Sequence, residues 1–472
     1  MVVYSFIFFL LIFVAIGVLS TLKSKGDNND YLMAGNDVAP WLAGLSAVAT
    51  NNSGYMFIGM IGYTYMSGVQ SIWVLIAWLA GDFFASLFVH KKLRIVTEER
   101  GLLSFGGVLS RWHGTDYRKL RVLVGILTII FLGVYAAAQL KAGSKALHVL
   151  FGWDYALGAI IGSVIVFAYC LAGGIRASIW TDAAQSITMF FAMGLLCYVG
   201  IDETGGFNSF LLKLKNVSPT YLDFFPDNLP INNAFGMFLF AMGWFFGGVG
   251  VIGQPHIMVR FMTVDNPENI KKTKSYYYGW YFFFCILTFG VGLTARLIFP
   301  ETGAFDKELA LPMMGQKLLP EILIGVILAG IFSATMSTAD SQILSCSAAF
   351  SRDVIPKSKD SLWVTKITTA LVTILALIVA LYGSQNVFGL VLMAWSILGA
   401  AFGPLLLIYA FDKKVNEITA IMMILVSIAV TLTWRQSGAD SFLYEAAPGL
   451  LSGVLVYWIF NLSGFNKVKP ER

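Results

Sequence analysis

The stretch ATNNSG, residues 49–54, interrupts an apolar run that extends from residue 38 to residue 64. A second stretch, GGVGVIGQP at residues 247–255, interrupts the run from 233 to 258 in the same way. Asn, Ser and Thr side chains compete with the helical backbone for hydrogen bonds, and Gly and Pro weaken a helix directly. Each run is long enough to cross a membrane, so the pattern predicts two spanning helices that are broken near their middle.

The composition places the chain in a membrane. Only 12% of the 472 residues are charged, whereas 57% are hydrophobic. A soluble domain usually carries about 25% charged residues. The polar residues are too few to cover a water-facing surface, and the net charge of +5 provides no basic stripe for nucleic acid. We therefore predict a polytopic membrane protein without a nucleic-acid partner.

Thirteen apolar runs are continuous rather than alternating, which favours helices over the strands of a barrel. The first run has no positive residue before it and no cleavage site after it, so we expect a membrane helix rather than a signal peptide. The fold class is therefore all-α with about 13 transmembrane helices. The predicted spans are residues 4–22, 38–64, 70–90, 121–147, 154–173, 177–201, 233–258, 275–299, 319–349, 363–383, 386–411, 416–434 and 444–462.

The Lys and Arg residues indicate the orientation of the spans. If the N-terminus is outside, 24 of the 32 Lys and Arg residues fall on the inner side. Positive residues gather on the cytoplasmic side of membrane proteins. We therefore predict an outside N-terminus, a cytoplasmic C-terminus and an odd number of spans.

Spans two to six and seven to eleven form two units of five helices, and each unit begins with an interrupted helix. Because five is odd, the two units cross the membrane in opposite directions, which is typical of inverted-repeat transporters. The predicted domains are 1–36 (first helix and inner loop), 37–201 (first repeat), 202–232 (outer loop), 233–411 (second repeat) and 412–472 (two C-terminal helices and inner tail).

Other interpretations of these stretches were weighed. Small residues line helix interfaces in membranes, so close packing is the competing interpretation of either stretch alone. The GVGVIG segment, 248–253, matches a dinucleotide-binding pattern but lies in an apolar span rather than after a strand. No phosphate-binding loop, nucleophile–base pair or metal constellation is visible, and the four Cys lie in apolar runs. We predict no enzymatic activity and no cofactor, with Na⁺ only as a coupling ion.

Span nine carries a candidate cation site. Ala334, Ser337 and Thr338 stand at i, i+3 and i+4, on one face of a helix. Two hydroxyls and a carbonyl on one face suit a hard cation, which prefers oxygen ligands. The competing interpretation is that both hydroxyls bond back to carbonyls of their own helix. Carbonyls from the broken span two could complete the site.

Ionisable residues within the spans provide further candidates. Asp182, Asp340 and Asp82 are intramembrane carboxylates, which are rare and usually functional. For Asp182, the alternative is an interfacial position near the inner headgroups. We expect Lys141 and Lys145, one turn apart in the outer half of span four, to extend outward to the headgroups.

Several segments occur in order along nearly the whole chain: GQPHIMVRFM (253–262), MSTADSQIL (336–344), GGIR (173–176) with WTD (180–182), and AW (394–395) with GAAFGP (399–404). Together they resemble the sodium:solute symporter family, and within it the bacterial sodium/proline symporters. The resemblance implies an inverted five-plus-five helix core of the leucine-transporter type with flanking helices. It also implies a sodium site formed by Ala49, Asn52, Ala334, Ser337 and Thr338, and sodium coupling through Asp182, with Asp340 and Ser341 as further candidates. Tyr135 matches a pocket aromatic of the proline carriers.

The departures from that family pattern concern the solute. Proline carriers have an Asp where this chain has Asn51 and a Met where it has Asn52. They have Trp and Tyr where it has Gly247 and Val251, which enlarges the expected cavity. The solute is therefore predicted to be an amino acid, proline-like or bulkier, or a carboxylate. The predicted solute contacts are Thr50, Ser53, Gly54, Tyr135, Trp244 and Gln254.

These expectations combine into a sodium-coupled symporter that imports a small organic solute across a bacterial plasma membrane by alternating access. Its predicted partners are Na⁺, the solute and the lipid bilayer. The alternative is a sensor of the same fold that binds solute without transporting it. A channel would need a continuous polar pore, and no ring of charges or carbonyls indicates one.

Overall fold

The structure, a computed structural model, describes residues 1–23, 27–227, 229–355, 362–384 and 386–466. Within these ranges the secondary structure is helical apart from one isolated β-bridge between Val38 and Val264. The α-helices are α1 (Val2–Thr21), α2 (Asn28–Met33), α3 (Pro40–Asn51), α4 (Met60–Ser67), α5 (Ile72–Arg100), α6 (Phe105–Arg111), α7 (Arg118–Phe151), α8 (Tyr155–Glu203), α9 (Phe207–Leu214), α10 (Ala234–Val249), α11 (Pro255–Met262), α12 (Ile270–Ile298), α13 (Ala310–Leu318), α14 (Glu321–Ala348), α15 (Leu362–Tyr382), α16 (Val387–Ala410), α17 (Glu417–Gln436) and α18 (Ala446–Leu462).

Ten helices of the described ranges are long and apolar enough to cross a membrane. All thirteen predicted segments are helical, but three do not stand as separate long helices. The segment 38–64 is broken, and its second part continues through residue 100 as one helical run. The apolar helices at 155–168 and 446–462 are shorter than a full span. The count of thirteen spans therefore remains a prediction.

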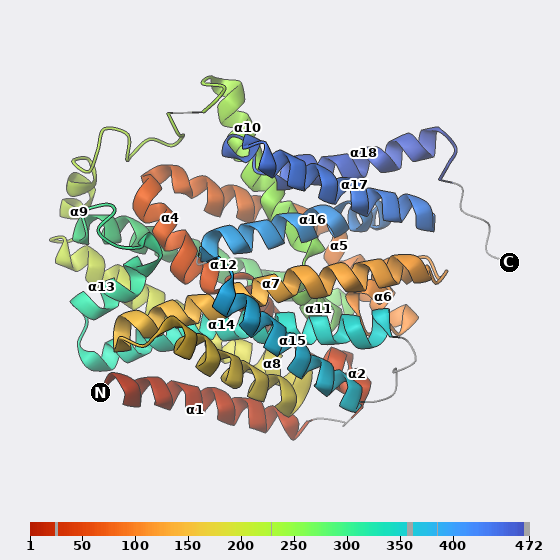
Figure 1. Cartoon of the computed structure of the whole chain (residues 1–472), viewed down its shortest axis with the longest axis horizontal. Helices are drawn as coiled ribbons and strands as arrows, with labels where there is room; N and C mark the ends of the chain where they lie inside the picture. The colour runs from red at the N-terminus through yellow and green to blue at the C-terminus, as the bar shows by residue number, and fades with distance from the viewer. Residues whose placement is uncertain (24–26, 228, 356–361, 385, 467–472) are drawn as a thin grey trace.

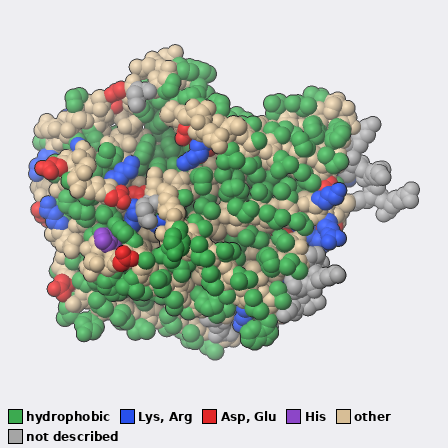
Figure 2. Space-filling model, in the orientation of Figure 1, with side chains coloured by type: hydrophobic (Ala, Val, Ile, Leu, Met, Phe, Trp, Pro, Cys, Tyr) green, Lys and Arg blue, Asp and Glu red, His purple; other side chains and the backbone are tan. Residues whose placement is uncertain are grey.

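The long helices run in roughly one direction and form a bundle (Figure 1). The N-terminus, α9 and α13 lie at one end, and α2 and α6 lie at the other. Figure 2 shows hydrophobic side chains over the middle of one face, with charged side chains gathered towards the two ends. This distribution suits a bundle whose middle faces lipid.

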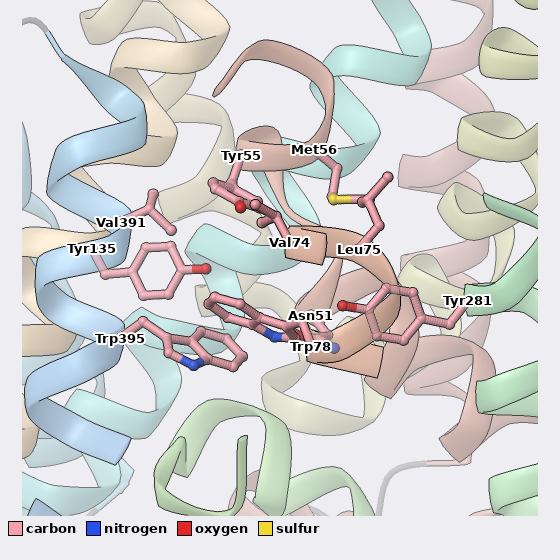
Figure 3. Close-up of a pocket in the computed structure, with 10 residues that line it drawn as sticks. All are labelled: Asn51, Tyr55, Met56, Val74, Leu75, Trp78, Tyr135, Tyr281, Val391 and Trp395. Atoms are coloured by element: carbon pink, nitrogen blue, oxygen red, sulfur yellow. The ribbon is translucent and has the colours of Figure 1, made fainter. Parts of the chain in front are cut away.

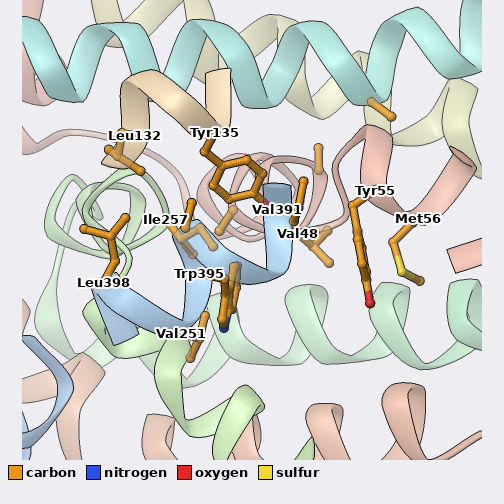
Figure 4. Packing of buried hydrophobic residues seen from close by; sticks show 14 of the residues in the cluster. Val48, Tyr55, Met56, Leu132, Tyr135, Val251, Ile257, Val391, Trp395 and Leu398 are labelled. Carbon is orange, nitrogen blue, oxygen red and sulfur yellow. The ribbon is translucent and has the colours of Figure 1, made fainter. Parts of the chain in front are cut away.

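Burial separates central helices from peripheral ones. In the most apolar 18-residue window of each helix, 89% of the residues in α16 and 83% in α14 are buried, against 17% in α1. Helix α14 packs against α7, α8, α1 and α3. The centre of the bundle is closed by hydrophobic side chains from several helices, among them Val48, Tyr135, Val251 and Trp395 (Figure 4).

The first predicted helix break lies at Asn52. Helix α3 begins with Pro40, a residue that suits a first helical position, and ends at Asn51. Asn52 has φ −87° and ψ 58°, outside the helical region. A π-helical turn, η2 (Tyr55–Gly59), then leads into α4. The prediction of a break at residues 49–54 is confirmed.

The second predicted break lies between α10 and α11. Helix α10 ends at Val249 and is followed by a 3₁₀ turn, η4 (Gly250–Gly253). Gln254 is extended, with φ −97° and ψ 100°, and Pro255 begins α11. The prediction of a second interrupted helix is therefore also confirmed. A further non-helical residue, Gly174 (φ 56°, ψ −147°), divides α8 between the predicted spans 154–173 and 177–201.

Candidate functional site

The first break lies directly against α14. The Ser337 hydroxyl donates to the carbonyl oxygens of Ala49 (3.3 Å) and Ala334 (3.2 Å). The Thr338 hydroxyl donates to the carbonyl oxygens of Thr50 (2.9 Å) and Ala334 (3.1 Å). Two hydroxyl and three carbonyl oxygens therefore converge between α3 and α14.

These five residues are 0% exposed, and the converging groups are all oxygens, the ligands that a hard cation prefers. A hydroxyl has lone pairs as well as a proton. If both hydroxyls turn their protons aside, two hydroxyl and three carbonyl oxygens are left to surround an ion. The Ser337 and Thr338 hydroxyls do bond back within α14, as the competing interpretation expects, but each also reaches the backbone of α3.

The structure places Asn52 differently from the other predicted sodium ligands. Its backbone N–H and its side-chain amide both donate to the Val48 carbonyl, at 2.9 and 3.0 Å. Of the α3 carbonyls, those of Ala49 and Thr50 accept the α14 hydroxyls. The Thr50 carbonyl was not among the predicted ligands, because sequence spacing does not show how the chain turns once the helix ends.

A second polar cluster adjoins the first. Asp182 of α8 accepts hydrogen bonds at Oδ2 from Ser46 (2.7 Å) and from Arg260 of α11 (3.2 Å). Arg260 also donates to Ser178 (2.6 Å) and to Ser341. Asp182 and Arg260 are both 0% exposed, so the carboxylate is enclosed by protein and paired with a buried guanidinium.

The remaining coupling candidates join this cluster to the first one. Asp340 accepts from Ser178 (3.1 Å) and Ser341 (3.0 Å). The Ser341 hydroxyl donates to the Ser337 carbonyl at 2.5 Å and lies 3.2 Å from the Thr50 hydroxyl. The oxygen cluster and the carboxylate cluster therefore share hydrogen-bonded atoms. An ion bound at one would alter hydrogen bonding at the other.

Arg260 is the functional candidate that sequence reasoning missed. It was counted among the inner positive residues, yet its guanidinium is fully buried between the two interrupted helices and α8. The available signal was its position seven residues after Gly253, within the helix that follows the second break. A buried charge requires a partner, and three carboxylates had been noted within spans.

A cavity lies beside the first break and is lined in part by Asn51 and Tyr55 (Figure 3). Its free volume is about 20 Å³, room for about one water molecule, so the lining side chains close the cavity in this structure. A solute would fit there only after these side chains move apart. The lining residues are Asn51, Tyr55, Met56, Val74, Leu75, Trp78, Tyr135, Tyr281, Val391 and Trp395.

Two of the predicted solute contacts lie at this cavity. Tyr135 lines it, and the Ser53 hydroxyl is 3.4 Å from the Tyr135 hydroxyl. Trp244 lies behind the wall, because its ring stacks on Trp78 at 6.3 Å and on Tyr444 at 5.0 Å.

Three other predicted contacts are not among the lining residues of this cavity. The Thr50 hydroxyl points to α14, 3.4 Å from the Ser337 carbonyl. Gly54 donates its N–H to Gln139, and an added Cβ would meet Thr335 at 2.6 Å, so this residue packs between α7 and α14. The Gln254 amide donates to backbone carbonyls of η4 and α16. In each case the direction that the residue faces depends on helix rotation, which sequence spacing near a break does not determine.

The aromatic residues of the cavity were missed for a related reason. Tyr55, Trp78, Tyr281 and Trp395 stand in apolar runs, where an inward ring cannot be distinguished from a lipid-facing one. Hydrophobic periodicity gives no help in a helix that is apolar on all sides. Only the packing of α5, α12 and α16 turns these rings towards one centre.

The expectation that Lys141 and Lys145 extend to the headgroups is wrong. Both are 3% exposed. Lys145 pairs with Glu308 and Asp306, each at 2.6 Å, and Lys141 donates to the Gly383 carbonyl at 2.8 Å. The loop before α13 folds over the end of α7 and supplies the partner charges, so the amines need not reach the lipid headgroups.

The four cysteines are free and buried, as predicted. Within the described residues, no group of three or more His, Cys, Asp or Glu side chains is arranged to hold a metal ion.

The chain is similar to known transporters along nearly all of its length. It is 29% identical over 443 residues to the high-affinity proline transporter PutP of Bacillus subtilis (strain 168), covering 92% of each chain. It is 28% identical over 456 residues to the sodium/proline symporter of Escherichia coli (strain K12), covering 94% of this chain and 89% of the relative.

Solved structures show the same fold at lower identity. A Na⁺-coupled sialic acid symporter in a substrate-bound outward-open state superposes with a TM-score of 0.82, at 20% identity over 98% of both chains. Mhp1, a nucleobase-cation-symport-1 family transporter, gives 0.59 at 16% identity, over 93% of this chain and 96% of that one. The family model described as the sodium:solute symporter family matches residues 31–427. The chain therefore belongs to the sodium:solute symporter family.

Proposed function

We propose that this chain imports a small amino-acid-like solute together with Na⁺ by alternating access. Family membership supplies the coarser statement: the chain is an integral membrane transporter of Na⁺ and a small solute, and it is not an enzyme. The relatives named as proline transporters support an amino acid as the solute class. The sensor alternative gains no support from any contact described above.

The observation that carries the proposal is the position of the oxygen cluster. The hydroxyls of Ser337 and Thr338 reach the carbonyls of the broken helix, and Asn51 at the end of that same helix lines the cavity. Na⁺ bound between α3 and α14 would hold the end of α3 in place and so shape the cavity. Solute and ion would then stabilise each other reciprocally, by about 1–3 kcal/mol.

Two further parts of the proposal concern the whole chain. We propose that residues 37–201 and 233–411 are two inverted repeats, each beginning with one of the broken helices. We also propose that the protein lies in a bacterial plasma membrane with its N-terminus outside, which is supported by the 24 Lys and Arg residues assigned to the inner side.

The experiment measures solute uptake into proteoliposomes with and without an inward Na⁺ gradient. In Ser337→Ala/Thr338→Ala, uptake at limiting Na⁺ should fall at least 10-fold, because two of five oxygen ligands are removed. Ser347→Ala is the matched control, since its hydroxyl is also buried on α14 but bonds to Ile343 and Thr369 rather than to α3.

Unchanged Na⁺ dependence in the double variant would remove this site from the mechanism. Solute binding without accumulation, in the unaltered protein under a Na⁺ gradient, would favour the sensor instead. The control variant should keep both the uptake rate and its Na⁺ dependence within about twofold of the unaltered protein, as expected for a residue remote from the site.

A further inference from the structure

Asn51, the last residue of α3, is the one amide side chain among the lining residues of the cavity. Its nitrogen Nδ2 donates to the Tyr277 hydroxyl at 2.5 Å and to Asp82 Oδ2 at 3.4 Å. Both partners lie behind the cavity wall. They belong to α12 and α5, so two other helices fix the orientation of this amide.

Asp82 acts only as an acceptor in this arrangement. The Tyr277 hydroxyl donates to its Oδ2 at 2.6 Å, and the Tyr278 hydroxyl donates to its Oδ1 at 2.7 Å. The carboxylate is 0% exposed, and Lys274 of α12 acts on it electrostatically, although no Lys, Arg or His of the described residues lies within ion-pair distance. Each of its two oxygens accepts from a donor, so an acceptor atom placed beside Asp82 would find no hydrogen to accept.

The direction of the Asn51 amide follows from this. An amide has one donor end and one acceptor end, and its orientation is decided by its hydrogen-bond partners. A flip would place the amide oxygen against the oxygen of Asp82, two acceptors at hydrogen-bond distance. The nitrogen therefore stays towards Asp82, and the oxygen Oδ1 is the polar end left for the cavity.

The remaining cavity wall favours the same kind of ligand. Aromatic rings from Trp78, Tyr135, Tyr281 and Trp395 line it, and no Lys or Arg does (Figure 3). Aromatic faces attract cations, especially where water is excluded. An acceptor oxygen among aromatic faces therefore suits a protonated amine and does not suit a carboxylate at this position.

We propose that Asn51, oriented by Asp82, binds the protonated amino group of the solute and so restricts transport to solutes that carry an N–H-bearing ammonium. This inference rests on the proposed symport function and assigns the residue that would recognise the amino group of an amino-acid-like solute. Asp82 is a positioning residue, because it acts on the solute through Asn51.

The test compares probes that differ in the amino group. Thermal shifts of the purified full-length protein in saturating Na⁺ are measured with L-proline, L-alanine and L-leucine, and with the matched acids cyclopentanecarboxylate, propionate and 4-methylpentanoate. At least one amino acid should stabilise the protein, and its amine-free partner should require at least a 10-fold higher concentration for the same shift, because the amide oxygen is left without a donor.

Variants separate positioning from general damage. Asn51→Leu removes the acceptor and should abolish the preference for the amine. Asp82→Asn frees the Asn51 amide to turn. The ratio of the two concentrations that give the same thermal shift, amine-free acid over amino acid, should then fall about 10-fold, while the shift given by the amine-free acid is unchanged. Tyr278→Phe removes a hydroxyl that contacts only Oδ1 of Asp82, and this variant should retain most of the preference for the amino acid over its amine-free partner.

Equal shifts from an amino acid and its amine-free partner would overturn the inference, as would the absence of any shift with all three amino acids. A preference that survives in Asp82→Asn would overturn the positioning role. These outcomes are distinct from failure of the proposed function. Na⁺-driven accumulation of an amine-free acid would leave symport intact and contradict only this inference, whereas loss of all Na⁺ dependence would contradict the symport itself.

Discussion

Both helix breaks leave backbone carbonyls without helical partners, and the two breaks satisfy these carbonyls with different donors. At the first break, the carbonyls of Ala49 and Thr50 accept from hydroxyls on α14. At the second, the Gly247 carbonyl accepts from the Trp395 indole at 2.7 Å, and the Gly250 carbonyl accepts from the Gln254 amide at 3.3 Å.

This difference in donors decides which break can bind a cation. A hydroxyl can turn its proton away and offer lone pairs, whereas an indole or amide N–H offers only a donor. Carbonyls that face hydroxyls can therefore exchange those hydrogen bonds for a shared cation. Carbonyls that face N–H groups are already satisfied by partners that cannot become ligands. The first break is suited to binding, and the second is suited to packing.

Glycine contacts support this division. A Cβ added at Gly248 would lie 1.9 Å from the Trp78 carbonyl oxygen, and one at Gly253 would lie 2.6 Å from the Leu398 carbonyl oxygen. The neighbouring atoms are backbone, which cannot move aside easily. The second break therefore holds α5 and α16 in close contact with α10 and η4, and it supports Trp78 and Trp395, two rings of the cavity.

The largest expected effect comes from filling this close contact. Gly248→Val should destabilise the folded protein by about 3 kcal/mol or more, because the side chain must displace the backbone of α5. The measurement is the melting temperature and the yield of monodisperse protein in detergent. Gly279→Val is the control, since a Cβ there meets nothing within 4 Å. Normal melting of Gly248→Val would show that the second break is not a rigid packing contact.

A smaller loss of stability is expected from Trp395→Phe. This change keeps an aromatic ring but leaves the buried Gly247 carbonyl without its indole donor, at a cost of about 1–3 kcal/mol. The melting temperature should fall, while Na⁺ affinity measured without solute should stay within about twofold, because none of the proposed sodium ligands has changed. A 10-fold loss of Na⁺ affinity would contradict the division between a binding break and a packing break.

The sequence predicted both breaks because a break is a local event. Asn, Ser, Gly and Pro act on their own turn of helix, so the breaks fall where ATNNSG (49–54) and GGVGVIGQP (247–255) stand. The pairing of the α14 hydroxyls could likewise be predicted from the sequence, because the spacing of Ser337 and Thr338 relative to Ala334 places them on one helix face. These features needed no knowledge of how helices pack.

The contacts made by single side chains were harder to predict. Thr50 and Asn51 are adjacent, yet Thr50 faces α14 and Asn51 faces the cavity, because the helix turns about 100° per residue. The partner of Arg260 is Asp182, 78 positions away in sequence, and no local pattern joins them. Lys145 pairs with Glu308 only because the loop before α13 folds over α7. The facing of Thr50 and Asn51 and the partners of Arg260 and Lys145 are therefore determined by tertiary packing.

The smallest expected effect comes from removing one hydroxyl, that of Thr338, at the first break. Thr338→Val keeps the shape of the side chain and removes one oxygen, so Na⁺ affinity should fall about 10-fold, or about 1.4 kcal/mol, while melting without Na⁺ changes little. Thr338→Ser keeps the oxygen and should retain the affinity. The measurement is the Na⁺-dependent increase in melting temperature, which follows from preferential binding to the folded state. If Val and Ser behave alike, the hydroxyl at position 338 is only a backbone donor, like the indole of Trp395. The first break would then differ from the second only in the residues that form it.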